Sequence, residues 1–192
     1  MFQHILVPLD GSSRAEQALP IAARIARATG GSVQLVQVVS PPIDYSGGWA
    51  PVPLVNQEII DAEMSTAAAY LQSLATCPRF SGIEIRTEVL LGLPVQRLLA
   101  CAGVPEIDLL VLCSHGRTGF SRWVLGSVAH ALVHHCPVPV LVLRQSEAPA
   151  SLAPVDATGP LRTLVPLDGS PCAEAALRPA AHLTATLAGT GQ

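Results

Sequence analysis

The sequence contains no lysine, because all eleven of its cationic side chains are arginine. A P-loop nucleotide site needs a lysine on the β- and γ-phosphates, and a Schiff-base enzyme needs a lysine amine. The absence of lysine therefore excludes both chemistries. Charged residues make up only 13% of the chain and the net charge is −3, so no basic tract favours nucleic acid as a partner.

Paired cysteines and long apolar segments are missing as well. The five cysteines are odd in number and show no CxxC spacing, which favours reduced thiols in the cytoplasm over a disulfide framework. No apolar run reaches about 18 residues, so no membrane span is expected. The N-terminus lacks the basic segment of a signal peptide. Apolar residues still make up 49% of the 192 residues, which is enough for a sizeable core.

Apolar runs typical of buried strands alternate with segments of helical periodicity through the first 145 residues. Strands are expected at 5–9, 33–39, 83–91, 107–112 and 138–143, and helices at 13–29, 56–75, 94–102 and 127–135. This alternation predicts an α/β fold, a doubly wound five-stranded parallel sheet with helices on both faces. The third strand alternates most and is expected at an edge. The ligand crevice is expected at the carboxyl ends of the strands.

Two local features are expected in the first helix. Ser13 is followed three residues later by Glu16, which is the spacing of a capping box. Pro20 lies inside the helix and is expected to bend it or to remove one backbone hydrogen bond.

The motif LVPLDGS occurs twice, at residues 6–12 and again at 164–170. This repeat divides the chain into a domain at 1–145, a linker at 146–160 and a partial second copy at 161–192, with one strand and one helix. A lone βα unit cannot bury both of its faces. The second copy is therefore expected to dock on the first domain, to pair with another chain, or to belong to a longer tandem protein.

The segment 113–127 carries the strongest functional signal. It joins an expected strand to an expected helix and contains three glycines. A glycine-bearing loop at a helix start gathers backbone amides at the positive end of the helix dipole, which favours a phosphate group. Asp10 ends the first strand at the same edge of the sheet, so it is expected beside this anion site.

Thiols and imidazoles in and after this segment are candidate reactive or metal-binding groups. Cys113 lies near the helix terminus, which would lower its pKa and make redox sensing a minor hypothesis. Cys113 with His115, and the run from His134 to Cys136, have the residue types of zinc ligands. Their spacing matches no usual zinc finger, so no metal site is predicted.

Four stretches of the chain resemble the universal stress protein family. They are residues 5–12, 114–119, 126–127 and 135–142, and the resemblance covers 1–144, with 162–191 as a partial second copy. The ATP-binding branch of that family has the pattern Gly, two residues, Gly, nine residues, Gly, then Ser or Thr. Gly116, Gly126 and Ser127 fit this pattern, whereas Cys113 replaces its first glycine.

The resemblance implies an adenine nucleotide alpha hydrolase-like fold with a cradle for ATP, which can carry Mg²⁺. Asp10 would lie near the ribose, Val38 or Val39 would flank the adenine, and residues 126–128 would hold the β- and γ-phosphates. It also implies a homodimer formed through the fifth strand, from Val138 to Leu143. The residues implied to contact nucleotide are Pro8, Leu9, Asp10, Val38, Val39, Cys113, His115, Gly116, Arg117, Gly126, Ser127 and Val128.

Three functions remain open at this point. The first is a cytoplasmic nucleotide-gated signalling or stress-response module that needs no catalysis. The second is a slow ATPase, or a nucleotidyl or phosphoryl transferase, in which His115 would be the acid or base. The third is a ligand-free dimeric adaptor in which Cys113 blocks ATP.

Overall fold

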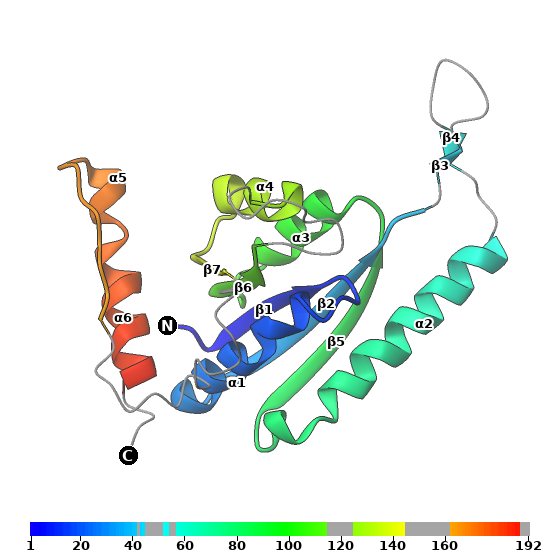
Figure 1. The fold of residues 1–192 in the computed structure, drawn as a ribbon, viewed down its shortest axis with the longest axis horizontal. Helices are drawn as coiled ribbons and strands as arrows, with labels where there is room; N and C mark the ends of the chain where they lie inside the picture. The colour runs from blue at the N-terminus through cyan, green and yellow to red at the C-terminus, as the bar shows by residue number, and fades with distance from the viewer. Residues whose placement is uncertain (42, 45–51, 54–56, 115–124, 145–161, 189–192) are drawn as a thin grey trace.

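Five parallel strands form the central sheet of the protein, in the order β5-β2-β1-β6-β7 (Figure 1). The computed structural model describes residues 1–41, 43–44, 52–53, 57–114, 125–144 and 162–188. The sheet strands are β1 (His4–Leu9), β2 (Ser32–Val39), β5 (Glu84–Leu91), β6 (Leu109–Cys113) and β7 (Val140–Leu143). A two-stranded antiparallel pair, β3 (Ile43–Asp44) and β4 (Val52–Pro53), follows β2 and was not predicted.

Helices cover both faces of the sheet. On one face α1 packs on β1, β2 and β6, and α2 packs on β2 and β5; on the other face α3 packs on β1 and β2, and α4 packs on α3 and β7. No helix that the structure describes is long and apolar enough to cross a membrane. The helical elements of this domain are η1 (Ala15–Gln17), α1 (Ala18–Thr29), α2 (Gln57–Ala75), η2 (Pro78–Phe80), α3 (Pro94–Ala102) and α4 (Ser127–His135).

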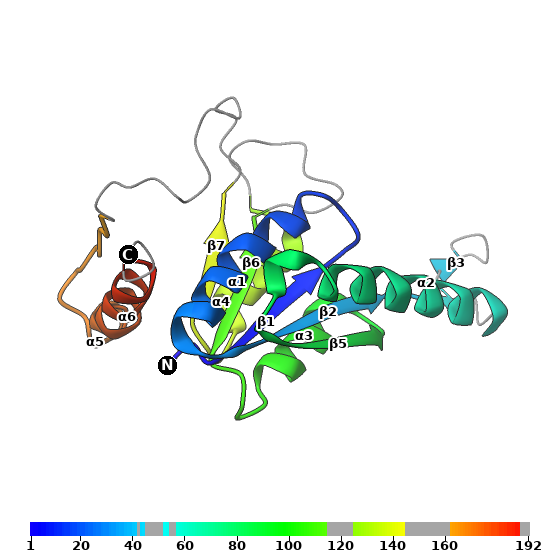
Figure 2. The same cartoon turned by 90° about the horizontal axis from the view of Figure 1, so that it is seen from below.

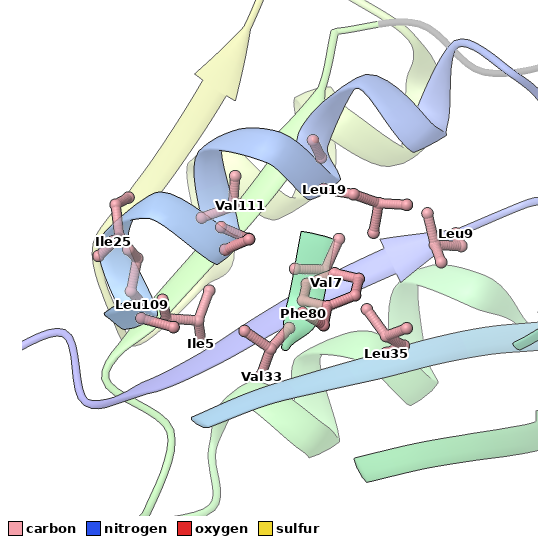
Figure 3. Packing of buried hydrophobic residues seen from close by; sticks show 14 of the residues in the cluster. Ile5, Val7, Leu9, Leu19, Ile25, Val33, Leu35, Phe80, Leu109 and Val111 are labelled. Atoms are coloured by element: carbon pink, nitrogen blue, oxygen red, sulfur yellow. The ribbon is translucent and has the colours of Figure 1, made fainter. Parts of the chain in front are cut away.

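The central strand β1 is buried on both faces. Ile5, Leu6 and Val7 are each 0% exposed. Because successive side chains point to opposite faces, Ile5 and Val7 enter the core under α1 and α2, while Leu6 enters the core under α3 and α4. Figure 3 shows the first of these cores, where Leu19 and Ile25 of α1 lie over the β1 side chains. Burial on both faces explains why β1 reads as a continuous apolar run.

The predicted doubly wound parallel sheet is confirmed. Each expected strand and helix of the first domain is present. Their ends lie within two residues of the predicted ones, except that α1 begins five residues later than expected, at Ala18. The third strand in sequence, β5, lies at one edge as expected, and β7 lies at the other.

The start of the first helix differs from the predicted capping box. The hydroxyl of Ser12, not Ser13, accepts the amide of Ala15 at 3.2 Å, and η1 precedes α1. Gly11 has a φ of 79°, which brings Ser12 into position for this bond. Since α1 itself begins at Ala18, Pro20 lies in its first turn, where a proline costs little.

The C-terminal segment repeats the turn of residues 10–16 in geometry as well as in sequence. Asp168 accepts the amide of Ser170 at 2.9 Å, and the Ser170 hydroxyl accepts the amide of Ala173 at 3.1 Å. These bonds correspond to those of Asp10, Ser12 and Ala15. Two helices follow, α5 (Pro171–Glu174) and α6 (Leu177–Ala188).

The strand expected in this second copy is not formed, because residues 162–168 have no strand partner in the structure. The helix α6 instead packs against α1, where the guanidinium of Arg24 donates to the Leu187 carbonyl at 2.5 Å. The His182 ring meets Phe2 edge-on, with 6.3 Å between the ring centroids. Figures 1 and 2 both place α6 at the opposite end of the molecule from α2.

Gly30 and Gly31, at the end of α1, offer a matched pair of substitutions. A Cβ on Gly31 would lie 2.3 Å from the backbone oxygen of Gln3, whereas a Cβ on Gly30 meets nothing within 4 Å. Gly30 has a φ of 65°, so Gly30→Ala carries only the cost of a left-handed backbone, about 1–2 kcal/mol. We expect Gly31→Ala to cost about 3 kcal/mol or more, because the backbone of Gln3, just before β1, has to shift. Urea unfolding of both variants measures the difference, and equal midpoints would contradict this packing.

Candidate functional site

A cavity of about 240 Å³ opens at the carboxyl ends of β1 and β6, where the strand order of the sheet reverses. Such a switch point is where ligands bind in open α/β sheets. Its lining comes from the ends of β1, β2 and β6, from η1, and from α3 and α4. The lining residues are Pro8, Leu9, Asp10, Ala15, Val38, Pro94, Leu98, Leu112, Cys113, Ser114, Gly126, Ser127, Val128, Ala129 and Leu132.

The first turn of α4 forms one wall of this cavity. Gly126 is the N-cap, and no side chain in the described residues caps the helix. The amides of Ser127, Val128 and Ala129 therefore lack an intrahelical acceptor, as at any helix start. The amide of Gly126 donates to the Ser114 carbonyl at 2.8 Å, which ties the start of α4 to the end of β6. The cavity thus meets a fixed positive helix end that favours an anion.

Asp10 lies at the rim of the cavity, held by the turn that follows β1. One of its carboxylate oxygens accepts both the amide and the hydroxyl of Ser12, at 3.0 Å and 2.6 Å. These two hydrogen bonds hold the carboxylate at the end of β1. Such a group can accept hydrogen bonds from hydroxyls of a ligand.

The remaining wall is apolar. Pro8 and Val38 contribute from the strand ends, and Pro94, Leu98 and Leu132 contribute from α3 and α4. A slot with an apolar wall on one side and backbone donors on another suits a flat ring that carries a negative group. The three helical residues were missed by the sequence analysis, and only the helical periodicity of their segments hinted that they face inward.

Cys113 does not have the lowered pKa expected from the helix terminus. Burial of the half-buried thiol, together with the nearby Asp10 carboxylate, raises the pKa of Cys113 to about 11. Its Sγ lies 3.9 Å from the carbonyl oxygen of Ala15, so the side chain points toward η1. The expectation that the pKa of Cys113 is lowered is therefore wrong, and a protonated thiol does not favour redox sensing.

The structure brings most of the sequence-predicted residues together at this cavity. Val39 is an exception: it points to the opposite face of the sheet from Val38 and lines a second cleft. His115, Gly116 and Arg117 lie outside the described residues. The predicted residues that line the cavity are Pro8, Leu9, Asp10, Val38, Cys113, Gly126, Ser127 and Val128.

The second cleft, of about 880 Å³, lies between α2 and the ends of β1 and β2. It is acidic, since Asp10, Glu58 and Glu63 line it. Among the residues that the structure describes, the buried Oε1 of Gln37 in this cleft has no hydrogen-bond partner. Within the same described residues, no group of three or more histidine, cysteine or carboxylate side chains gathers to hold a metal ion.

The chain resembles several known proteins in sequence and in structure. A universal stress protein of Methanocaldococcus jannaschii is 30% identical over 149 residues, which are 76% of this chain and 84% of that protein. The universal stress protein UspA of Lactobacillus plantarum has a solved structure that is 29% identical, with a TM-score of 0.59, over 74% of this chain and 98% of that one. A universal stress protein solved in complex with cAMP shares the fold at 22% identity, with a TM-score of 0.56, over 75% of this chain and 98% of that one.

The family model of the universal stress proteins matches residues 1–144, which hold the whole sheet and the cavity at its switch point. On this match, and on the 30% identity to the archaeal relative, the chain belongs to the universal stress protein family.

Proposed function

We propose that the chain binds an adenine nucleotide, ATP with Mg²⁺, in the cavity at the switch point and acts as a nucleotide-gated signalling module. The observation that carries this proposal is the start of α4, which no described side chain caps and whose first residues, with Gly126, line the cavity. Backbone amides at a helix start are suited to phosphate oxygens and need no lysine. The absence of lysine from the sequence is therefore compatible with phosphate binding.

In this proposal the base and the ribose of the nucleotide bind to the other walls of the cavity. The apolar slot formed by Pro8, Val38 and Leu98 takes the base, and the fixed carboxylate of Asp10 accepts from the ribose hydroxyls. A related protein of the same fold has been solved with cAMP, an adenine nucleotide, which supports a ligand of this class.

The neutral state of Cys113 also supports a phosphate ligand. The residue replaces a glycine of the ATP-binding pattern, and a thiolate there would place a negative charge beside the phosphates. Because burial keeps the thiol protonated, Cys113 contributes no such charge at neutral pH. The thiol thus lines the cavity as a small apolar group.

Assembly and location form part of the proposal. We place a homodimer contact at β7, since among the described residues it is an edge strand and Val140 to Leu143 are only half-buried. A cytoplasmic location fits the five cysteines, all of which are free thiols.

Substituting Ser127 tests the phosphate end of the site. Ser127 is exposed at the first position of α4, so Ser127→Glu places a carboxylate where the helix dipole favours it and leaves the fold intact. The same carboxylate repels phosphate, so we expect MgATP affinity to fall at least about tenfold, measured by titration calorimetry.

The control for this experiment is Ser127→Ala, which removes only the hydroxyl and leaves the backbone amides in place. Its affinity is expected to stay close to that of the unaltered protein. No heat and no thermal stabilisation of the unaltered protein at millimolar MgATP would contradict the proposed function.

Alkylation measures the protonation state of Cys113 directly. With a pKa of about 11 against an ordinary 9.0, Cys113 at pH 8 has about a hundredfold less thiolate than an unshifted cysteine. We expect iodoacetamide to label the exposed Cys172 much faster than the half-buried Cys113, as followed by peptide mass spectrometry. Equal rates for the two cysteines would show that Cys113 is ionised in the folded protein.

A further inference from the structure

We propose that His130 and His134, on the exposed side of α4, form a binding site for a divalent cation of the zinc or nickel type. The two residues are four positions apart in α4, so they lie one turn apart on the same side of the helix. Their ring centroids are 4.5 Å apart with an angle of 48° between the rings. Both side chains are exposed, so the ion reaches them from solvent.

This spacing is suited to one ion held by two imidazoles. Histidines at positions i and i+4 of a helix direct their nitrogens to a common point, which is the arrangement of the histidine pair in helical zinc sites. Imidazole is a preferred ligand of zinc, copper and nickel. Water completes the coordination of the ion, because no third ligand is grouped with the pair in the described residues.

The position of the pair in α4 adds to the attraction for a cation. His134 lies in the last turn of the helix, where unpaired carbonyl groups give the negative end of the dipole. The sequence of α4, SVAHALVHH, contains no arginine that would repel the ion.

The neighbouring residues His135 and Cys136 do not belong to this site. The His135 ring lies 6.4 Å from that of His134, and adjacent helix positions point in different directions. Cys136 packs against the core under α3 and α4, and burial raises the pKa of its thiol. The site therefore differs from the run His134 to Cys136 considered in the sequence, since it uses His130 and no thiol.

Titration of the untagged protein with Ni²⁺ tests the site. We expect one bound ion per chain by calorimetry. Binding to the folded state at about ten times the dissociation constant is expected to raise the midpoint of thermal unfolding by about 3–6 °C. His130→Ala and His134→Ala are each expected to weaken binding at least about tenfold, because one of two ligands is lost.

The matched control is His135→Ala, which removes an exposed imidazole next to the pair and is expected to leave binding unchanged. All three histidines are exposed, so the metal-free variants are expected to unfold within about 1–2 °C of the unaltered protein. Titration with Co²⁺ adds a spectroscopic readout, since a cysteine ligand gives a thiolate charge-transfer band and an imidazole pair does not.

Three results would overturn the site. They are binding that survives His130→Ala or His134→Ala, binding that is lost in His135→Ala, and a thiolate band with Co²⁺. Because the readouts are metal binding and stability, none of them depends on whether the cavity at the switch point takes a nucleotide.

Discussion

Hydrogen bonding of β1 to a parallel strand on each side is the constraint on which the architecture depends. β2 and β6 pair with its two edges, and helices bury Ile5, Leu6 and Val7 from both faces. From β1 the chain runs through β2 to β5 at one edge, and then crosses back to β6 and β7 at the other. Because crossovers between parallel strands are right-handed, α1 and α2 lie on one face of the sheet and α3 and α4 on the other. The segments that follow β1 and β6 lead to opposite faces of the sheet, and the cavity lies between the ends of these two strands.

Strands and helices of the first domain could be predicted because their burial is strongly patterned. A strand covered on both faces is a short apolar run, and each helix shows a stripe of small or apolar residues. The residue that caps the first helix was harder to predict. Either Ser12 or Ser13 could accept a hydrogen bond at the start of this helix. In the structure Ser12 does so, because Gly11 has a left-handed backbone conformation. The sequence pattern does not show that conformation. The segment 164–167 repeats β1 but forms no strand, because a strand requires a neighbour to pair with.

The predicted site residues that line the cavity are those whose positions follow from the order of strands and helices along the chain. Asp10 and Cys113 end neighbouring parallel strands, so the sheet brings them together, and Gly126 follows from the start of α4. The wall from Leu98 and Leu132 depends on how α3 packs on α4, which no local pattern encodes. The thiol of Cys113 points toward η1, and its burial raises the pKa, which the position of Cys113 in the sequence does not show.

The duplicated turn bears on the order in which the chain acquires its structure. At residues 168–174 the turn and the first helical bonds form although no sheet surrounds them, and Leu164 is 91% exposed where its counterpart Leu6 is 0% exposed. Contacts between residues near one another in sequence form quickly. The pairing of β1 with β6 instead joins residues about a hundred positions apart, which is slow. We therefore expect the Asp-Gly-Ser segment to form early in folding, and the pairing of β1 with β6 to limit the rate.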